Sequence, residues 1–459
     1  MPKKTRLRLV GYSLVGTLIL LAVPVSSQAE SQGKLTLEAA LEHALQNSLE
    51  LQVIRTELGV ARGVLTQAQT YPFNPALELE GNGGRARTLD GPVEHRTVGG
   101  FSVGLSQVIE IKGQRGIRTD IATANLTQTQ WEIRDAERRV LADVMRAFAK
   151  LLEAQELLEL VENAVALAEE TRETARTQFE AGEVPRLDLL RAEVELRRAS
   201  TRQVAEKRRI ATARKNLNLR LGRAPDAPLR AEGPLLFVEP SGTKAELLKQ
   251  ALELRPDLKA AEAGLQASRR RVRLVRAERL FPEVEVALRY EDSRDFEERD
   301  RRVMLDFAIP LPLFNRRQGE LEAALAEELR QDAEIALVQA RIETEVAIAF
   351  EQFQGSQQIV EQYVQQILPQ QEQNFHLLRE GYTLGQFGLT DVLLAQRGLI
   401  DVRFDYLGAI GDFNTAVAEL WQALGLVTFS TTSQTSVSGP KTAGYLVGIS
   451  NSRKKGYQP

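Results

Sequence analysis

The chain has 459 residues, a formal net charge of −3 from 59 basic and 62 acidic side chains, and no cysteine. This length allows more than one domain's worth of core, and the charge balance argues against a nucleic-acid binder, which needs a basic excess. The lack of cysteine excludes disulfides, thiol catalysis and Cys-ligated metals.

Residues 1–29 have the layout of a secretory signal peptide. Lysines and arginines precede an uncharged apolar run, which ends in small residues at Ser27 and Ala29. An uncleaved membrane anchor is the alternative, but Pro24 and the small-residue end favour cleavage. No later stretch approaches the ~20 apolar residues of a spanning helix. We therefore expect a mature protein that is periplasmic, secreted or inserted in a membrane as a β-barrel.

Sequence landmarks recur along the chain. Gly182 and Asp188 recur 203 residues later as Gly385 and Asp391, and an apolar pair near residue 50 recurs with a spacing of 207. A near-constant spacing over separate landmarks indicates that one unit was duplicated.

The duplication predicts the domain organisation. We expect a first repeat over residues 30–230 and a second over residues 231–427. Each would contain a short helix, a strand pair, a very long helix, a glycine break and another long helix. The Ser/Thr/Gly-rich residues 428–459 are typical of a disordered tail.

Two stretches of each repeat alternate apolar and polar residues, as strands with one apolar face do. They are residues 77–80 and 101–106 in the first repeat, and residues 283–290 and 303–309 in the second. A soluble β-hairpin packed on a helix is the alternative, because single strand signals of membrane barrels are weak. The duplication and the export signal favour membrane strands.

Long stretches without helix breakers follow the strands. No glycine occurs between Gly116 and Gly182, and a helix of about 60 residues would be ~90 Å long. Apolar residues in both repeats step by alternating three and four, the pattern of coiled-coil seams. These seams are Val140, Val144, Ala147, Leu151, Ala154, Leu158, Val161, Val165 and Ala168, and Val392, Ala395, Leu399, Val402, Tyr406, Ala409, Phe413, Ala416, Leu420 and Ala423.

The glycine breaks mark chain reversals. Glycine leaves the helical backbone conformation at low cost at a helix C-terminus, and Pro185 and Thr390 suit the start of a following helix. We therefore interpret residues 182–188 and 385–391 as the tips of two coiled-coil hairpins.

Four amphipathic strands cannot close a barrel alone. If their apolar face met lipid, the edge strands would leave unpaired backbone groups in hydrocarbon, which is not tolerated. Closure requires other chains, and three chains of four strands would give 12 strands around a water-filled interior.

Several motifs carry a resemblance to a known family. GYTLGQFGLTDVLLAQ, followed by a heptad helix and LWQALGL, resembles the final hairpin of TolC-like outer-membrane efflux proteins, and AGEVPRLDLLRAEVELRRAS resembles its counterpart in the first repeat. NPALELEGNGG and VGLSQVIEIKGQRGIR are more narrowly similar to the CzcC-like branch, which serves heavy-metal cation efflux. The resemblance covers residues 35–427.

The resemblance implies a mostly α fold with a small β part. Long coiled-coil hairpins would form a trimeric periplasmic α-barrel, continuous with a 12-stranded outer-membrane β-barrel. The homotrimer would export solutes, in this branch heavy-metal cations, with a periplasmic membrane-fusion adaptor and an inner-membrane proton-driven pump. Multidrug efflux and type I protein secretion remain alternatives, because nothing in the lumen chemistry chooses among cargoes.

An acidic constriction is implied at the periplasmic end. Asp391 occupies the first acidic position past the second tip, whereas the position three residues on is Leu394, a departure that puts a double acidic ring in doubt. Three Asp391 carboxylates would attract cations. The alternative role of Asp391 is to cap its helix, and both roles can coexist. For the matching Asp188, capping alone is the preferred interpretation.

The tips are also the expected docking sites for the adaptor. Exposed apolar side chains at a solvent-facing tip indicate a partner, whereas the glycines also fit plain turn chemistry. The predicted docking residues are Gly182, Arg186, Leu187, Gly385, Leu389 and Thr390.

We expect no catalysis, no cofactor and no bound metal. His43, His95 and His376 have no metal-ligand spacing, and no hydrolase, phosphate-loop or zinc-protease motif occurs. A periplasmic coiled-coil adaptor is a less favoured reading, because adaptors are expected to carry one hairpin flanked by β-rich modules.

Overall fold

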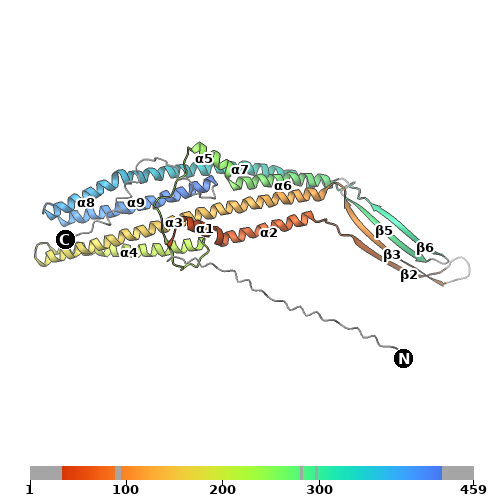
Figure 1. Ribbon diagram of the computed structural model, residues 1–459, viewed down its shortest axis with the longest axis horizontal. Helices are drawn as coiled ribbons and strands as arrows, with labels where there is room; N and C mark the ends of the chain where they lie inside the picture. The colour runs from red at the N-terminus through yellow and green to blue at the C-terminus, as the bar shows by residue number, and fades with distance from the viewer. Residues whose placement is uncertain (1–33, 88–94, 280–282, 295–297, 426–459) are drawn as a thin grey trace, which may run out of the picture.

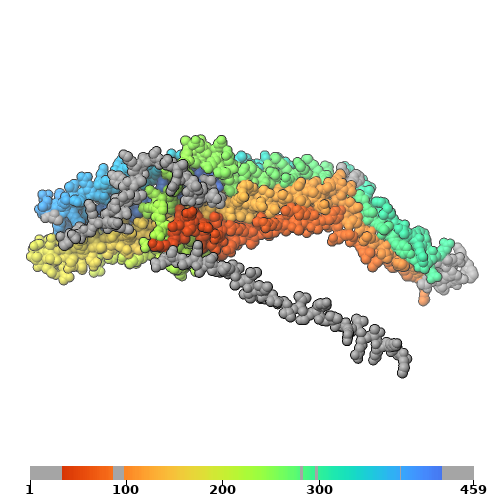
Figure 2. Space-filling view, viewed as in Figure 1, coloured from red at the N-terminus to blue at the C-terminus, as the bar shows by residue number. Residues whose placement is uncertain are grey.

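The computed structural model describes residues 34–87, 95–279, 283–294 and 298–425. The predicted signal peptide and the predicted C-terminal tail lie outside these residues. The molecule is an elongated rod, with a bundle of long helices over most of its length and a ribbon of strands at one end (Figure 1, Figure 2). Both hairpin tips lie at the opposite end.

Helices make up most of the described chain. In chain order they are α1 (Leu37–Asn47), α2 (Leu49–Gln69), α3 (Gln114–Glu180), α4 (Arg186–Arg220), α5 (Lys244–Leu254), α6 (Pro256–Glu278), α7 (Gln318–Gln362), the π-helix η1 (Tyr363–Ile367), α8 (Leu368–Thr383) and α9 (Leu389–Leu424). The strands are β1 (Lys34–Leu35), β2 (Ala76–Arg87), β3 (His95–Glu110), β4 (Arg230–Ala231), β5 (Glu283–Arg294) and β6 (Arg299–Ala308).

The four long strands form one antiparallel sheet in the order β2-β3-β5-β6. The predicted strand pairs are therefore present and extend further than their alternating cores. The central β3–β5 pairing joins the two halves of the chain, which leaves β2 and β6 as edges. A short parallel pair, β1 with β4, also ties the N-terminus to the segment after α4.

Helix α3 is one continuous rod of 67 residues, about 100 Å long at 1.5 Å per residue. Its length follows from the absence of proline and glycine after Gly116, and it ends just before Gly182. Helix α4 packs along one end of α3 and α2 along the other, on either side of α1 (Figure 1). Every predicted seam position is buried or half-buried, so the heptad pattern is confirmed as inward-facing.

The predicted single short helix of each repeat is wrong, because two helices precede each strand pair. Ser48 separates α1 from α2, and Arg255 separates α5 from α6; both have extended ψ angles near 125°. Proline explains the second break, since Pro256 disfavours a helical conformation at the residue before it.

The second repeat contains the predicted very long helix, with one irregularity that α3 lacks. Residues 318–383 match α3 in length but contain the π-helix η1, in which the N–H of Leu368 donates to the carbonyl of Tyr363. Pro369 follows at once and lacks an N–H for a regular helix. The wider π turn accommodates this proline within an otherwise continuous helix.

The largest apolar core lies around the middle of the bundle. Met145, Phe148 and Leu151 of α3 are buried there with Val417 and Leu420 of α9, and side chains of α1, α5 and α7 complete the cluster. Full burial of such side chains stabilises the fold by about 1.5–3 kcal/mol each. Because both repeats contribute, the two halves pack as one unit.

Candidate functional site

Both predicted hairpin tips are present and are closed by the same cap. Gly182 and Gly385 adopt left-handed φ values of 77° and 72°, as glycine does after a helix end. The bonds are Gly182 N to Phe179 O (2.9 Å) and Glu183 N to Gln178 O (2.8 Å), and Gly385 N to Tyr382 O (3.0 Å) and Gln386 N to Gly381 O (2.8 Å). The duplication thus preserved the reversal bond for bond.

Asp391 lies in the first turn of α9 and is exposed. Its Oδ2 accepts a hydrogen bond of 3.1 Å from the N–H of Gly388, the residue before the helix. The expected helix-capping contact is therefore present. The carboxylate is held in place at the tip while the residue remains open to solvent.

Asp188 is placed differently, although it occupies the matching position in α4. The residue before the helix is Pro185, which has no N–H, so the expected capping hydrogen bond does not form. Asp188 instead accepts from Arg191 at 3.2 Å. Its charge is therefore compensated within the first turn of α4.

The two leucines at the tips have opposite environments. Leu187 is 54% exposed, as expected, and Arg186 beside it is exposed too. Leu389 is only 7% exposed, so the expectation that it faces solvent is wrong. It packs in a small cluster with Ala175 and Ala192, since the second tip folds its apolar residues against the first hairpin.

Two polar contacts tie the tips together. The Tyr382 hydroxyl donates to Gln178 Oε1 at 3.0 Å, and Arg191 donates to the half-buried Thr390 hydroxyl at 2.7 Å. Arg191 therefore links Asp188 of the first tip to Thr390 of the second. The sequence had singled out Asp188 and Thr390 but not the arginine between them, because i,i+3 spacing alone does not reveal a contact across hairpins.

A cleft of about 160 Å³ lies behind the tips, between α3, α4 and α9. Small side chains, including Ala164, Ala168 and Ala192, line one part of it. At its rim Arg202 pairs with Asp401 at 3.1 Å and lies 3.4 Å from the centre of the Phe404 ring. These contacts join the hairpins beyond the tips themselves.

The sheet at the other end of the rod has two contrasting faces. On one face, called the apolar face here, side chains from all four strands stand in rows. Two such rows are Leu77, Leu105, Leu288 and Leu305, and Leu79, Val103, Tyr290 and Val303. No layer formed by the described residues covers them: Leu79 is 71% exposed and Val303 is 72% exposed.

The opposite, polar face carries charged and small side chains at the alternate positions. Glu78 on β2 pairs with Arg289 on β5 at 3.4 Å, across the small residue Gly104. Ser106 also donates to Glu78 at 3.3 Å. This face suits contact with water.

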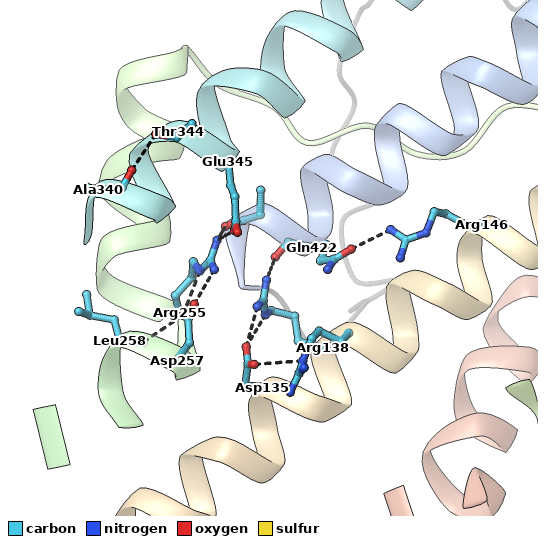
Figure 3. Close-up of polar contacts among 12 residues, drawn as sticks. Asp135, Arg138, Arg146, Arg255, Asp257, Leu258, Ala340, Thr344, Glu345 and Gln422 are labelled. Carbon is cyan, nitrogen blue, oxygen red and sulfur yellow. Dashed lines mark hydrogen bonds and ion pairs between the residues drawn. The ribbon is translucent and has the colours of Figure 1, made fainter. Parts of the chain in front are cut away.

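A buried arginine network anchors the end of α9 (Figure 3). Arg255 lies between two carboxylates, with Nη2 2.5 Å from Asp257 Oδ2 and Nη1 2.5 Å from Glu345 Oε2. Burial disfavours these charges, but the hydrogen bond and charge of Arg255 outweigh it and lower the pKa of the Asp257 carboxyl. Asp257 and Glu345 in the same way raise the pKa of Arg255.

The same network satisfies the last carbonyls of α9. Arg138 of α3 donates to the carbonyl of Gln422 at 2.5 Å and pairs with Asp135 at 2.6 Å. Arg255 also donates to the carbonyl of Ala423 at 3.3 Å. Cations at a helix C-terminus are favourable. Sequence reasoning missed these residues, because charged side chains are ordinarily read as solvated.

Two kinds of feature are absent from the described residues. None of their helices combines the length and apolar character needed to cross a lipid bilayer. They also contain no cluster of three or more His, Asp or Glu side chains arranged to hold a metal ion.

Comparison with known proteins adds a family and a fold. The family model for outer membrane efflux proteins matches residues 40–223 and 247–426. The cobalt-zinc-cadmium resistance protein CzcC of Cupriavidus metallidurans is 29% identical over 405 residues, covering 88% of this chain and 93% of that protein. The solvent efflux pump outer membrane protein SrpC of Pseudomonas putida is 27% identical over 406 residues, covering 84% of each.

A solved structure has the same fold. The crystal structure of CusC, reported with conformational changes accompanying folding and transmembrane channel formation, has a TM-score of 0.68. It is 20% identical in sequence, and the match covers 84% of this chain and 91% of that one.

Proposed function

We propose that three copies of this chain, which belongs to the outer membrane efflux protein family, close into a single conduit. As a member of that family, the chain is an efflux channel protein of the outer membrane and extends into the periplasm. The uncovered apolar face of the sheet supports the closure of three copies most directly. Rows of leucine, valine and aromatic side chains exposed to water would be costly, whereas the same rows suit contact with lipid.

The sheet cannot meet lipid as a monomer. β2 and β6 are edge strands, and their unpaired backbone groups would have no partner in hydrocarbon. Pairing of β6 with β2 of the next copy removes both edges, and three copies give a barrel of 12 strands. The polar face would then line a water-filled interior, which spares polar solutes the cost of entering the bilayer.

At the other end of the rod, the hairpin tips would receive a periplasmic membrane-fusion adaptor, which joins an inner-membrane proton-driven pump. Leu187 and Arg186 are exposed there and support this role. Gly182, Gly385 and Thr390 would contribute through the shape of the tips. Leu389 is buried and is left out of the docking surface.

Asp391 would form the acidic ring of the constriction. It is exposed and fixed by its bond to Gly388, so three carboxylates would present a preorganised cation-attracting site. Asp188 would contribute little charge, because Arg191 compensates it. The constriction is thus proposed to rest on the second hairpin.

Heavy-metal cations are the cargo that we propose. The similarity to CzcC, named for cobalt, zinc and cadmium resistance, supports this choice. Apolar solvents are the second candidate, because the chain is also similar to SrpC, named for solvent efflux. An acidic ring at Asp391 favours cations over neutral solvents.

The test is a strain of the source bacterium that lacks this protein, grown with zinc, cobalt, cadmium or copper and, in parallel, with toluene and cationic dyes. We expect sensitivity to metals that the wild-type chain restores. Sensitivity to solvents or dyes alone would contradict metal export but not the channel. A purified protein that remains monomeric and does not associate with detergent would contradict the conduit itself.

A further inference from the structure

The apolar face of the sheet becomes basic beyond its apolar rows, toward the end of the sheet that is remote from the helices. Because side chains alternate along a strand, Arg85 of β2, Arg294 of β5, and Arg299 and Arg301 of β6 point the same way as Leu79, Tyr290 and Val303. These four residues are called the arginine cluster here. Among the described side chains of this region of the face, Asp292 is the one acid.

The cluster carries more positive charge than its own contacts compensate. Asp292 accepts from Arg299 at 2.6 Å and lies 3.3 Å from Arg301. Arg294 and Arg299, however, stand directly opposite each other in the β5–β6 register. Like charges at such a cross-strand pair destabilise a sheet, so an anion beside them would remove a penalty as well as add contacts.

The cluster also borders a bare patch of backbone. In the rows of Arg301 and Arg299 the neighbouring strands contribute Gly81, Gly83 and Gly99. A Cβ added at Gly81 or Gly83 would meet no atom within 4 Å, whereas one added at Gly99 would lie 2.9 Å from the carbonyl oxygen of Asn82. Gly83 and Gly99 share the row of Arg294, so β2 and β3 contribute no side chain to the part of the face next to Arg294.

The height of the cluster matches the edge of the lipid-facing band. The apolar rows run from Ile109 to Phe101 along β3, a span of nine residues, and a tilted strand crosses a bilayer in about 9–11 residues. A lipid-facing band is ~25 Å tall and is bordered by aromatic residues. Phe101 and Tyr290, whose rings lie 6.2 Å apart, occupy that border, and the arginine cluster begins in the row of Phe101 and continues beyond it.

We propose that the arginine cluster binds the phosphate groups of anionic lipid headgroups in the outer leaflet of the membrane. The inference rests on the proposed function, because it requires the apolar face to meet lipid and the helices to enter the periplasm. Guanidinium groups bind phosphate through paired, charge-assisted hydrogen bonds. Arg299 and Arg301 are 56% and 58% exposed, so their donors are accessible. The occupant is a lipid because the surface continues the lipid-facing band without a break.

The test replaces the two arginines of the cluster that do not pair with Asp292, so that the buried Asp292 carboxylate keeps its partners. The variant is Arg85→Gln with Arg294→Gln. Its matched control, Arg289→Gln with Arg302→Gln, removes the same charge from the polar face of the same sheet. Native mass spectrometry of the full-length trimer would measure binding of bisphosphorylated lipid A, with phosphatidylcholine as the uncharged comparison.

We expect the first variant to bind lipid A about tenfold more weakly, as loss of charge-assisted bonds to phosphate implies, and the control to stay within twofold. Equal weakening of both variants, or of neither, overturns the proposal. Displacement of lipid A by excess inorganic phosphate would indicate a simple anion site and also overturns it. If the glutamine variant does not assemble, Arg85→Lys with Arg294→Lys keeps the charge, and weaker lipid A binding is still expected.

Conductance separates this inference from the proposed function. A wild-type trimer that conducts in planar bilayers, with lipid A binding unchanged in the variants, contradicts only the headgroup site. A wild-type protein that neither inserts nor conducts contradicts the channel.

Discussion

The first hairpin, α3–α4, and the second, α7–α9, close with the same glycine cap but differ along their length and at their acidic residues. Helix α3 is unbroken, whereas its counterpart contains a π turn before Pro369. Asp188 is paired with Arg191, whereas Asp391 is exposed and caps its helix. The glycine caps that reverse the chain are thus common to both repeats. The π turn and the exposed, helix-capping carboxylate belong to the second repeat alone.

The junctions between short helices differ more strongly still. Ser48 in the first repeat corresponds to Arg255 in the second, 207 residues later. Ser48 makes no side-chain cap bond to α2, whereas Arg255 holds two carboxylates and the end of α9. The second junction therefore depends on buried charge where the first does not.

Arg255→Ser, which copies the first junction into the second, should be strongly destabilising. We expect the free energy of unfolding to fall by about 3 kcal/mol, because Asp257 and Glu345 would lose their partner in a buried site. A larger loss is not expected, because Glu345 is still partly exposed. The thermal unfolding of the purified trimer measures it, with Arg255→Lys as a milder control. A loss as small as that of Ser48→Ala would contradict the network's role.

The pH dependence of the same pair of proteins sharpens this test. The pKa of Asp257 is lower in the folded protein than in the unfolded chain. The ionised carboxylate therefore stabilises the fold at pH values above the usual Asp pKa of about 3.9, and this stabilisation is lost as the pH falls through the folded pKa. The difference in stability between wild type and Arg255→Ser should therefore shrink as the pH falls below the usual Asp pKa and through the folded pKa of Asp257.

Proline at matched positions tests the π turn. Pro369 corresponds to Ala166 of α3 by the same spacing of 203 residues that relates the two tips. Ala166→Pro should cost about 3 kcal/mol or more, because α3 has no π turn to absorb the missing N–H. Pro369→Val should change stability by less than about 1 kcal/mol. Similar costs for both, measured by the same unfolding assay, would mean that η1 does not accommodate the proline.

The glycine caps should respond equally. Gly182→Ala and Gly385→Ala should each cost about 1 kcal/mol, because φ is positive at both sites and no atom crowds the new Cβ. Gly355→Ala, inside α7 with open space around it, is the control and should stabilise by about 0.5–1 kcal/mol. Unequal costs at the two tips would show that the caps are not equivalent.

Replacing the acidic residues with asparagine tests the smallest difference. The side-chain oxygen of asparagine can still accept the hydrogen bond from the N–H of Gly388, so Asp391→Asn should change stability little while removing charge. We expect the trimer's cation preference in planar bilayers to fall for Asp391→Asn and to stay unchanged for Asp188→Asn, whose charge Arg191 already compensates. Equal behaviour of the two variants would rule out a constriction specific to the second hairpin.

Much of this architecture could be predicted from local patterns. Strand alternation, heptad spacing and the glycines at 182 and 385 act over a few residues and are legible in one sequence. Burial of Leu389 and the link from Arg191 to Thr390 depend on how two hairpins separated by about 200 residues meet. Arg255 was missed because its partners Asp257 and Glu345 come from different helices, and a buried arginine has no periodic signature.

The lipid-facing sheet is the central claim, and the absence of cysteine in the chain makes it directly testable. Leu79→Cys and Glu80→Cys are adjacent on β2 and place a bimane label on opposite faces. In vesicles of brominated lipid, we predict strong quenching at position 79 and little at position 80. Equal quenching at the two positions, or quenching of both by an aqueous quencher alone, would contradict the account.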